Sequence, residues 1–263
     1  MALLFEPLTL RGTTIRNRVW LPPMCQYSAV DGVPNDWHLV HLGARAVGGF
    51  GLVIAEATSV VPEGRITPQD AGLWNDEQAQ AWARIVDVVH ARGALVGVQL
   101  QHAGRKASTF RPFHEGNGSV PAEQGGWTTV APSAVSFPGL ATPVALSDDE
   151  VAAIPHAFAA AARRALDAGF DTVELHAAHG YLLHQFLSPL SNVRTDRWGG
   201  SPENRARLLV ETTDAVRAVW PDDKPLLVRL SATDWTEGGL TVDDVAAVAA
   251  VLRGHGGDLV DVS

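Results

Sequence analysis

The amino-acid sequence predicts an α/β fold, and within that class a barrel. Short apolar runs alternate with helical patterns along the chain, which is typical of a parallel sheet with right-handed crossovers. The runs at 52–57 and 94–100 are almost continuously apolar, which indicates strands buried on both faces. Polar residues end several runs, and barrel enzymes draw their reacting groups from many strand ends, whereas a dinucleotide-binding sheet gathers them at one switch point.

The alternation assigns each element in order. Strands are expected at 19–21, 52–57, 94–100, 172–176, 226–231 and 259–262. Helices are expected at 37–47, 75–91, 148–168, 202–220 and 242–253. Two of these helices begin with recognisable caps. Ser147 followed by Glu150 forms a capping box, and Ser201 precedes a proline at the first helical position.

An N-terminal hairpin and a long excursion after the third strand complete this plan. The excursion, residues 101–146, is rich in Gly, Pro, Ser and Thr, and so long a loop in a compact domain is usually functional. Only about six strand–helix units are present, whereas a closed barrel needs eight. We therefore expect residues 1–263 to be a single domain that lacks strands seven and eight and the C-terminal segment. A complementary segment could complete it.

Composition excludes several classes of protein. The chain has 263 residues and a formal charge of −9, with scattered basic residues, which argues against nucleic-acid binding. The single cysteine, Cys25, cannot form an internal disulfide or a thiolate metal cluster, so a reducing, cytoplasmic setting fits best. The N-terminus lacks a basic region and a long apolar run, so neither a signal peptide nor a membrane span is expected.

The strongest local signal is VELHAAHGYLLHQFLSP at 173–189. If the chain leaves the strand in a helical turn, His176 and His179 come within reach of one small ligand. Two imidazoles could ligate a metal together with a third ligand such as Glu56 or Asp234, or they could donate hydrogen bonds to an oxyanion. They could equally be two satisfied polar residues in a loop. Tyr181 could act as a general acid or pack as an ordinary aromatic residue.

Three further residues carry polar chemistry at strand ends. Arg229 closes an otherwise apolar strand, and a buried guanidinium requires an anionic or carbonyl partner. Gln99 offers an amide that both donates and accepts, so the two could contact the polar edge of a flat heterocycle or form an ordinary core network. Cys25 is either a small buried hydrophobe or a reactive thiol.

With these residues the sequence resembles the old yellow enzymes, the FMN-dependent ene-reductases, and in particular their thermophilic-like, cysteine-containing subclass. The matching segments lie in the same order along the whole chain. They are LFEPLTLRGTTIRNRVWLPPMCQYS at 4–28, VQLQHAGRK at 98–106, ELHAAHGYLLHQFLSP at 174–189, NVRTDRWGGSPENRARLL at 192–209 and LLVRLSATDW at 226–235. The fold of that family is the (β/α)8 barrel, in agreement with the alternation.

The resemblance implies a role for each matching residue. Flavin contacts are expected from Pro23, Met24, Cys25, Ala57, Gln99 and Arg229. Cys25 would tune the redox potential, and Arg229 would stabilise the negative charge of the reduced flavin. His176 and His179 would bind the substrate carbonyl with no metal, and Tyr181 would protonate the α-carbon. Tyr27 and Lys106 would belong to the substrate pocket.

The implied activity is NAD(P)H-dependent reduction of activated C=C bonds in α,β-unsaturated carbonyl compounds, of the NADPH dehydrogenase type. FMN is the implied cofactor, NADPH or NADH the hydride donor, and a dimer or tetramer the usual assembly. In barrels of this type the loops after strands seven and eight hold the phosphate, so this chain alone is expected to bind FMN weakly or not at all unless another segment supplies that part. A split or truncated barrel, inactive without a complementary segment, and a metal-dependent barrel hydrolase remain the alternatives.

Overall fold

A computed structural model describes residues 2–113 and 116–263 of the chain. Its centre is a six-stranded, all-parallel sheet in the order β10-β9-β8-β5-β4-β3, which forms a half-barrel. The sheet strands are β3 (Trp20–Leu21), β4 (Leu52–Ser59), β5 (Leu95–Gln101), β8 (Thr172–Ala177), β9 (Leu226–Leu230) and β10 (Leu259–Val262). The helices are α1 (Asp36–Val47), α2 (Asp76–His90), α3 (Asp148–Asp167), α4 (Leu182–Leu187), α5 (Pro202–Arg217) and α6 (Val242–Gly254). The predicted α/β class is confirmed.

Local sequence explains where the helices begin. Ser147 accepts from the N–H of Glu150 while the Glu150 carboxylate accepts from the backbone of Ser147, so α3 starts with a complete capping box. Thr241 and Asp244 cap α6 in the same way. Helix α5 starts with a proline and ends at Arg217, before the expected residue 220. It stops there because the Arg217 guanidinium binds the carbonyls of Trp220, Pro221 and Lys224, which turns the chain.

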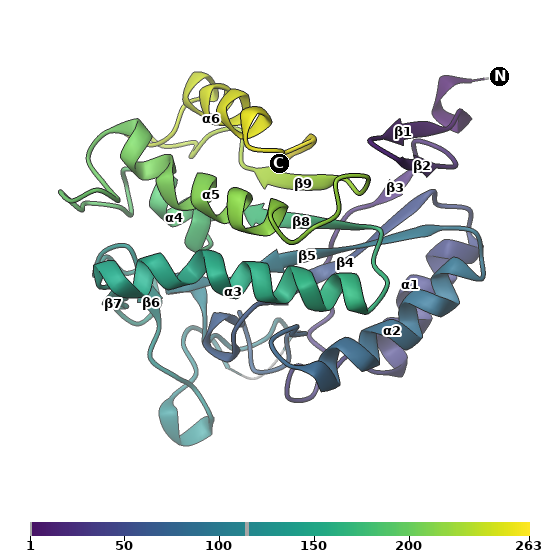
Figure 1. Ribbon diagram of the computed structural model, residues 1–263. Helices are drawn as coiled ribbons and strands as arrows, with labels where there is room; N and C mark the ends of the chain where they lie inside the picture. Colours follow the sequence, from purple (N-terminus) through teal and green to yellow (C-terminus); the bar gives the residue numbers. More distant parts are fainter. Residues whose placement is uncertain (1, 114–115) are drawn as a thin grey trace.

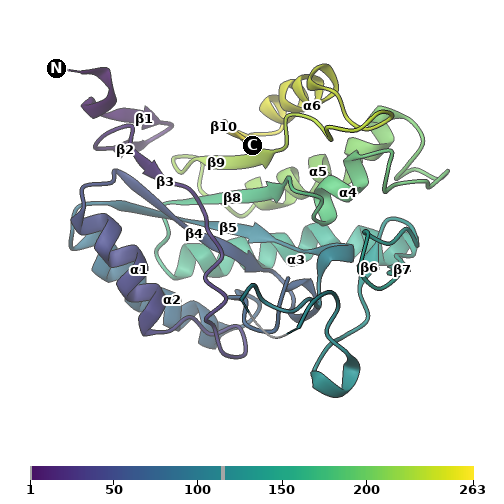
Figure 2. The same ribbon diagram turned by 180° about the vertical axis from the view of Figure 1, so that it is seen from behind.

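The helices cover one face of the sheet, and the interface between the two layers forms the larger core (Figures 1 and 2). Trp82 of α2 and Phe158 of α3 are completely buried there, as is Phe170 before β8. Trp82 and Phe170 meet edge to face with ring centroids 5.8 Å apart. Truncating any of the three would cost about 3–5 kcal/mol of folding free energy.

The opposite, inner face of the sheet changes character along the strands. Its N-terminal part is apolar and contains Ile15, Leu52, Ile54 and Leu227. The antiparallel pair β1 (Leu8–Leu10) and β2 (Thr13–Ile15) contributes Ile15 to this cluster. Both views place β1 and β2 at one end of the sheet and α4 at the other (Figures 1 and 2). The polar side chains of His176 and Arg229 lie near the carboxyl ends of β8 and β9, where the two residues are register partners.

Residues 102–146 form the excursion between β5 and α3. They include the short parallel pair β6 (Val130–Ala131) and β7 (Val144–Ala145) and single turns at Gly104–Lys106 and Ala122–Gln124. Trp127 Nε1 donates to Glu63 O (2.8 Å) and so attaches the segment to the turn after β4, and Arg105 Nη1 donates to Val135 O (3.0 Å) within the segment. Among the described residues, no helix is long and apolar enough to cross a membrane.

Candidate active site

His176 and His179 meet at the carboxyl end of β8. His179 Nδ1 lies 3.3 Å from His176 Nε2, and their ring centroids are 5.0 Å apart in an edge-to-face arrangement. His176 is 3% exposed, and its Nδ1 accepts a hydrogen bond from the Ala178 N–H. A neutral His176 therefore carries its proton on Nε2, so its single N–H donor lies 3.3 Å from His179 Nδ1.

Electrostatics keep both rings neutral. Burial lowers the pKa of His176 well below its ordinary value, and the charges of His179 and Arg229 lower it further. Burial also lowers the pKa of His179, and Arg229 adds to that effect. Two neutral imidazoles donate hydrogen bonds without bringing a full positive charge, which suits the polarisation of a carbonyl oxygen.

Tyr181 stands beside this pair at the N-cap of α4. Its ring lies 4.8 Å from that of His176, almost perpendicular to it. Burial raises the pKa of the Tyr181 phenol well above its ordinary value, with the charges of Cys25 and Tyr27 as further causes. The phenol therefore keeps its proton over the physiological pH range, as a general acid must.

The turn that presents His179 is strained and held from several sides. His179 has φ = 58°, a left-handed conformation that costs a non-glycine residue free energy. Lys106 Nζ donates to His179 O (2.7 Å), and His179 N donates to Ser231 Oγ (3.0 Å). Gln185 Nε2 donates to Gly180 O (2.7 Å). These contacts fix the imidazole of His179 near that of His176.

A histidine–carboxylate pair that the sequence analysis did not assign supports the same turn. His184 Nδ1 accepts from the Gly180 N–H (3.0 Å), and its Nε2 lies 2.8 Å from Asp234 Oδ1. Asp234 Oδ2 also accepts from Ser188 Oγ (2.6 Å) and the Leu240 N–H (2.8 Å). Sequence reasoning considered Asp234 only as a metal ligand. In the sequence, His184 follows Gly180 by four residues, and this spacing could have indicated that the two are in contact.

Cys25 and Tyr27 approach the site from the loop after β3. Cys25 and Tyr181 pack against one small cluster that includes Ala57. Burial raises the pKa of the Cys25 thiol well above its ordinary value, followed by the charges of Asp70 and Glu56, so the thiol is protonated. Burial likewise raises the pKa of Tyr27, which interacts with Cys25. Cys25 is therefore a partly buried thiol in apolar surroundings and not a thiolate nucleophile.

Glu56 of β4, suggested by the sequence only as a possible metal ligand, holds the loop after β3 in place. A register shift between Ala55 and Ala57 separates Glu56 from the regular alternation of β4. Its Oε2 accepts from the Gln26 N–H (2.9 Å), and its Oε1 lies 3.0 Å from His38 Nε2 of α1. Pro23 and Met24 lie in the same loop, and Met24 is 42% exposed. No contact between these two residues and the histidine pair is seen in the described chain.

Gln99 and Arg229 lie on the inner face of the sheet, each beside a carboxylate that sequence reasoning missed. Ala57, Gln99 and Glu174 are register partners across β4, β5 and β8, and Gln99 Nε2 donates to Glu174 Oε1 (2.7 Å). Arg229 pairs in register with His176 on one side and Asp261 on the other, and its Nε lies 3.2 Å from Asp261 Oδ2. Side chains alternate between the two faces of a strand, so Glu174 could have been placed on the face of His176 from the sequence.

Two buried polar atoms on this face lack hydrogen bonds. Glu174 Oε2 has no partner, and Arg229 Nε contacts Asp261 without hydrogen-bond geometry. Burial raises the pKa of Glu174 to about 7, helped by Asp261, although Gln99 and Arg229 act in the opposite direction. A surface that binds a polar heterocycle presents buried polar atoms without hydrogen-bond partners, together with amide and guanidinium groups. Gln99 and Arg229 therefore fit a bound flavin.

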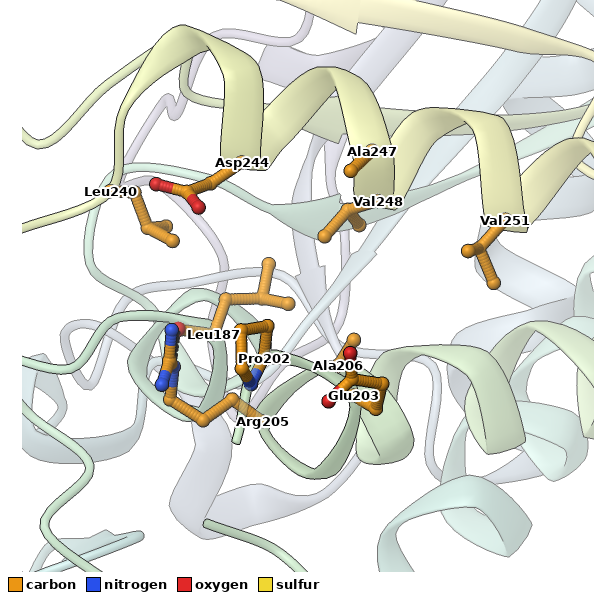
Figure 3. A pocket seen from close by; sticks show the side chains of 10 residues that line it. All are labelled: Leu187, Pro202, Glu203, Arg205, Ala206, Leu240, Asp244, Ala247, Val248 and Val251. Atoms are coloured by element: carbon orange, nitrogen blue, oxygen red, sulfur yellow. Dashed lines mark hydrogen bonds between the residues drawn. The ribbon is translucent and has the colours of Figure 1, made fainter. Parts of the chain in front are cut away.

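A cleft of about 420 Å³ opens at the strand ends beside His179. Its lining includes Arg105, Lys106, Phe137, His179, Gly180, His184, Ser231 and Asp234. A separate groove of about 130 Å³ lies between α5 and α6. Figure 3 shows Leu187, Pro202 and Ala206 facing Val248 and Val251 across it. This lining is mostly aliphatic, so the groove resembles a helix-packing seam and not a reaction site.

The histidines do not form part of a metal site in the described residues. No group of three or more His, Cys, Asp or Glu side chains could hold an ion there. Asp234, the carboxylate considered as a third ligand, is occupied by His184, Ser188 and the Leu240 N–H. Glu56 is occupied by His38 and the Gln26 N–H.

Comparison with known proteins decides the family. Residues 3–263 match the model of the NADH:flavin oxidoreductase / NADH oxidase family. The chain belongs to this family. An NADH:flavin oxidoreductase of Gibberella zeae is 49% identical to the chain over 98% of it, and an NADPH dehydrogenase of Bacillus subtilis is 46% identical over 99%. Those alignments span 66% and 72% of the two relatives.

Solved structures agree with the family and its barrel fold. An old yellow enzyme homologue from Zymomonas mobilis superposes with a TM-score of 0.85 and 33% identity, covering 98% of this chain and 72% of that one. The resemblance to the old yellow enzymes seen in the sequence is thereby confirmed, and FMN and a nicotinamide hydride donor are the cofactors of the family. The half-barrel sheet of this chain corresponds to part of that fold.

Proposed function

We propose that this chain is an FMN-dependent oxidoreductase that uses NADPH or NADH to reduce the activated C=C bond of α,β-unsaturated carbonyl compounds. One observation carries the proposal: the neutral His176–His179 pair, with a 3.3 Å contact between its nitrogens, lies beside the protonated phenol of Tyr181. A carbonyl clamp next to a proton donor is the apparatus that reduction of a conjugated alkene requires.

His176 and His179 orient the substrate, and Tyr181 transfers the proton. His179 donates a hydrogen bond to the substrate carbonyl oxygen, and the Nε2–H of His176 joins it when that oxygen replaces the 3.3 Å contact with His179 Nδ1. The two bonds withdraw electron density from the alkene. Tyr181 delivers a proton to the α-carbon. The nicotinamide donor is the source of the hydride that reaches the β-carbon, so one hydride and one proton add across the double bond.

The flavin face is assigned to Pro23, Met24, Cys25, Ala57, Gln99 and Arg229. Bound FMN would supply the two-electron chemistry that links the nicotinamide donor to the alkene. Gln99 would contact the heterocycle through an amide that Glu174 already orients at 2.7 Å. Arg229 would place a positive charge beside the ring, where it stabilises added negative charge. Tyr27 and Lys106 would shape the substrate side of the pocket.

Three wider proposals accompany this assignment. Residues 1–263 act as one flavin-binding barrel domain, since the inner face of one sheet carries the assigned flavin contacts from β4, β5 and β9. The chain works in the cytoplasm, in keeping with its single, reduced cysteine. It assembles as a dimer or tetramer, which size-exclusion chromatography with light scattering would test.

Single-turnover kinetics test the proposed reaction. The reduced flavoprotein is mixed with 2-cyclohexenone, and flavin reoxidation is followed in wild type and in the double variant His176→Ala/His179→Ala. Loss of one oxyanion donor costs about 10²–10³ in rate, so the double variant should reoxidise at least about 10²-fold more slowly with flavin reduction little changed. Full turnover by the double variant would contradict the assignment.

A further inference from the structure

Arg105 and Lys106 place two positive charges in the cleft beside His179. Neither side chain forms an ion pair with a carboxylate in the described part of the chain. Both are partly buried, and burial lowers the pKa of each, the charge of Arg105 adding to the effect on Lys106. Two partly buried cations against the one carboxylate of the cleft lining, Asp234, leave a net positive charge that a ligand anion can balance.

Both side chains retain unused hydrogen-bond donors. Lys106 Nζ gives one N–H to His179 O (2.7 Å) and lies 4.2 Å from the centroid of the Phe137 ring, which leaves two donors free. Arg105 Nη1 donates to Val135 O and Ser136 O, while no described group accepts from Nη2. Adjacent residues therefore present several charged donors to one cleft.

Asp234, the carboxylate in the cleft lining, acts on Arg105 through its charge but forms no ion pair with either cation in the described residues. It is already bound by His184, by Ser188 and by the Leu240 N–H. The cleft thus has a local excess of positive charge in a chain whose formal charge is −9. Such a concave positive site on a negative protein concentrates anions locally.

We propose that Arg105 and Lys106 form an anion subsite that receives the phosphate groups of the nicotinamide hydride donor. This inference rests on the proposed function, because it gives that donor a place in the cleft beside His179. Lys106 contacts the His179 carbonyl, so a bound phosphate would lie within one residue of the carbonyl clamp.

The number and arrangement of donors favour phosphate over the carboxylate of an acidic alkene. A carboxylate has two oxygens and is satisfied by one bidentate guanidinium. Arg105 and Lys106 together offer more donors than that, which suits the several oxygens of a phosphate or pyrophosphate. A cleft of about 420 Å³ also exceeds what a small cyclic enone needs.

Calorimetric titration with inorganic pyrophosphate tests the subsite without any reaction. The proteins compared are wild type, Arg105→Gln, Lys106→Gln and the control Arg163→Gln. Glutamine at 106 keeps an N–H donor for His179 O but removes the charge, and Arg163 is an exposed residue of α3 that is absent from the cleft lining. Each cleft variant should raise the Kd at least about tenfold, whereas the control should match wild type. Absence of saturable binding to wild type, or equal losses in all three variants, would overturn the proposal.

Matched ligands then identify the source of the anion. Titrations with NADPH, nicotinamide mononucleotide, nicotinamide riboside and succinate are compared. Lys106→Gln should weaken the two phosphate-bearing ligands at least tenfold more than the riboside, and pyrophosphate should compete with NADPH. Succinate binding as tight as pyrophosphate, with the same dependence on Lys106, would assign the subsite to an acidic alkene and overturn the donor assignment. Because these titrations need no turnover, a failure of enone reduction would not alter the affinities that they measure.

Discussion

The imidazole of His184 bridges the carboxylate of Asp234, 2.8 Å away, and the backbone N–H of Gly180, 3.0 Å away. His184 is 6% exposed, so this bridge connects the loop after β9 to the turn after β8 through the interior of the site. The turn it holds is the one that carries His179 in a left-handed conformation. By holding this turn, His184 and Asp234 position the imidazole of His179 relative to that of His176.

Asp234→Asn should reduce stability and change its acid dependence. Burial raises the pKa of Asp234, but hydrogen bonds from His184, Ser188 and the Leu240 N–H outweigh burial and bring the pKa to about 2. Since the pKa is depressed in the folded state, this contribution is complete above the unfolded value of about 3.9 and is lost as pH falls through about 2. Asp234→Asn should cost about 1–3 kcal/mol at pH 7. Urea unfolding at several pH values measures both effects.

The exposed Asp87 of α2 gives the matched control for that experiment. Asp87→Asn removes the same charge without touching the pair, so its unfolding curve should differ from wild type by less than about 0.5 kcal/mol. Equal stabilities for Asp234→Asn and Asp87→Asn at pH 7 would show that the Asp234 carboxylate does not hold the turn.

Glu174→Gln should stabilise the protein above neutral pH. Burial, followed by the charge of Asp261, raises the pKa of Glu174 to about 7 in the folded state, against about 4.3 when unfolded. Between these values the native state binds more protons, so the free energy of unfolding falls as pH rises from about 4.3 to about 7. Glutamine keeps the acceptor for Gln99 Nε2 without the charge.

Thermal unfolding of Glu174→Gln from pH 5 to 8 measures this effect, with the exposed Glu123→Gln as control. The gain in Tm should grow across that window and level off above about pH 7 for Glu174→Gln only. A loss of Tm at pH 8 would mean that the Glu174 charge is stabilised in the folded state, contrary to its surroundings. Asp70, whose pKa burial also raises to about 7, leaves a residual pH slope in both variants.

Tyr181→Phe should slow alkene reduction while leaving the hydride-accepting half of the cycle intact. The variant keeps the ring that packs against His176, 4.8 Å between centroids, and removes only the proton donor. General acid catalysis contributes about 10²–10⁴ in rate, so single-turnover oxidation by 2-cyclohexenone should fall by that factor. Flavin reduction by NADPH, measured in the same instrument, should change less than threefold. Equal losses in both half-reactions would indicate a packing role instead.

The rate of alkene reduction should show no inflection near pH 6.5. Burial lowers the pKa of both His176 and His179, so both imidazoles are already neutral at the ordinary titration point of histidine. Glu174 on the flavin face has a pKa of about 7, so the rates are compared in the Glu174→Gln variant, where they should show no step near pH 6.5. A bell or a step centred near pH 6.5 would mean that one ring titrates as an exposed histidine does.

Alternation in the sequence was sufficient to predict the α/β class and to place the sheet strands within a few residues. Long apolar strands and strong caps such as Ser147 with Glu150 make these elements locally determined. Helix α4 was not predicted, because its six residues LLHQFL are all buried and show no amphipathic period. Such a segment is fixed by tertiary packing and not by its own pattern.

The residues of the site also fall into two groups, those recognisable from the sequence and those that only the fold brings together. His176, His179 and Tyr181 were recognisable because they are close in sequence and carry unusual chemistry at one strand end. Alternation places Glu174 on the face of His176, but the contacts of Glu174 with Gln99 and of Asp261 with Arg229 join neighbouring strands, so they follow only from the sheet register. His184 and Asp234 are 50 residues apart, so only the fold brings them together.

The most direct test of the proposed function is a visible absorption titration with FMN, followed by anaerobic addition of NADPH. We compare wild type with Arg229→Ala, which removes the charge assigned to the flavin face. We predict a weak but saturable shift of the flavin bands that NADPH bleaches and 2-cyclohexenone restores, with a weaker complex still for Arg229→Ala. A wild-type chain that leaves the FMN spectrum unchanged at every concentration, or a complex that NADPH does not bleach, would contradict the proposed function.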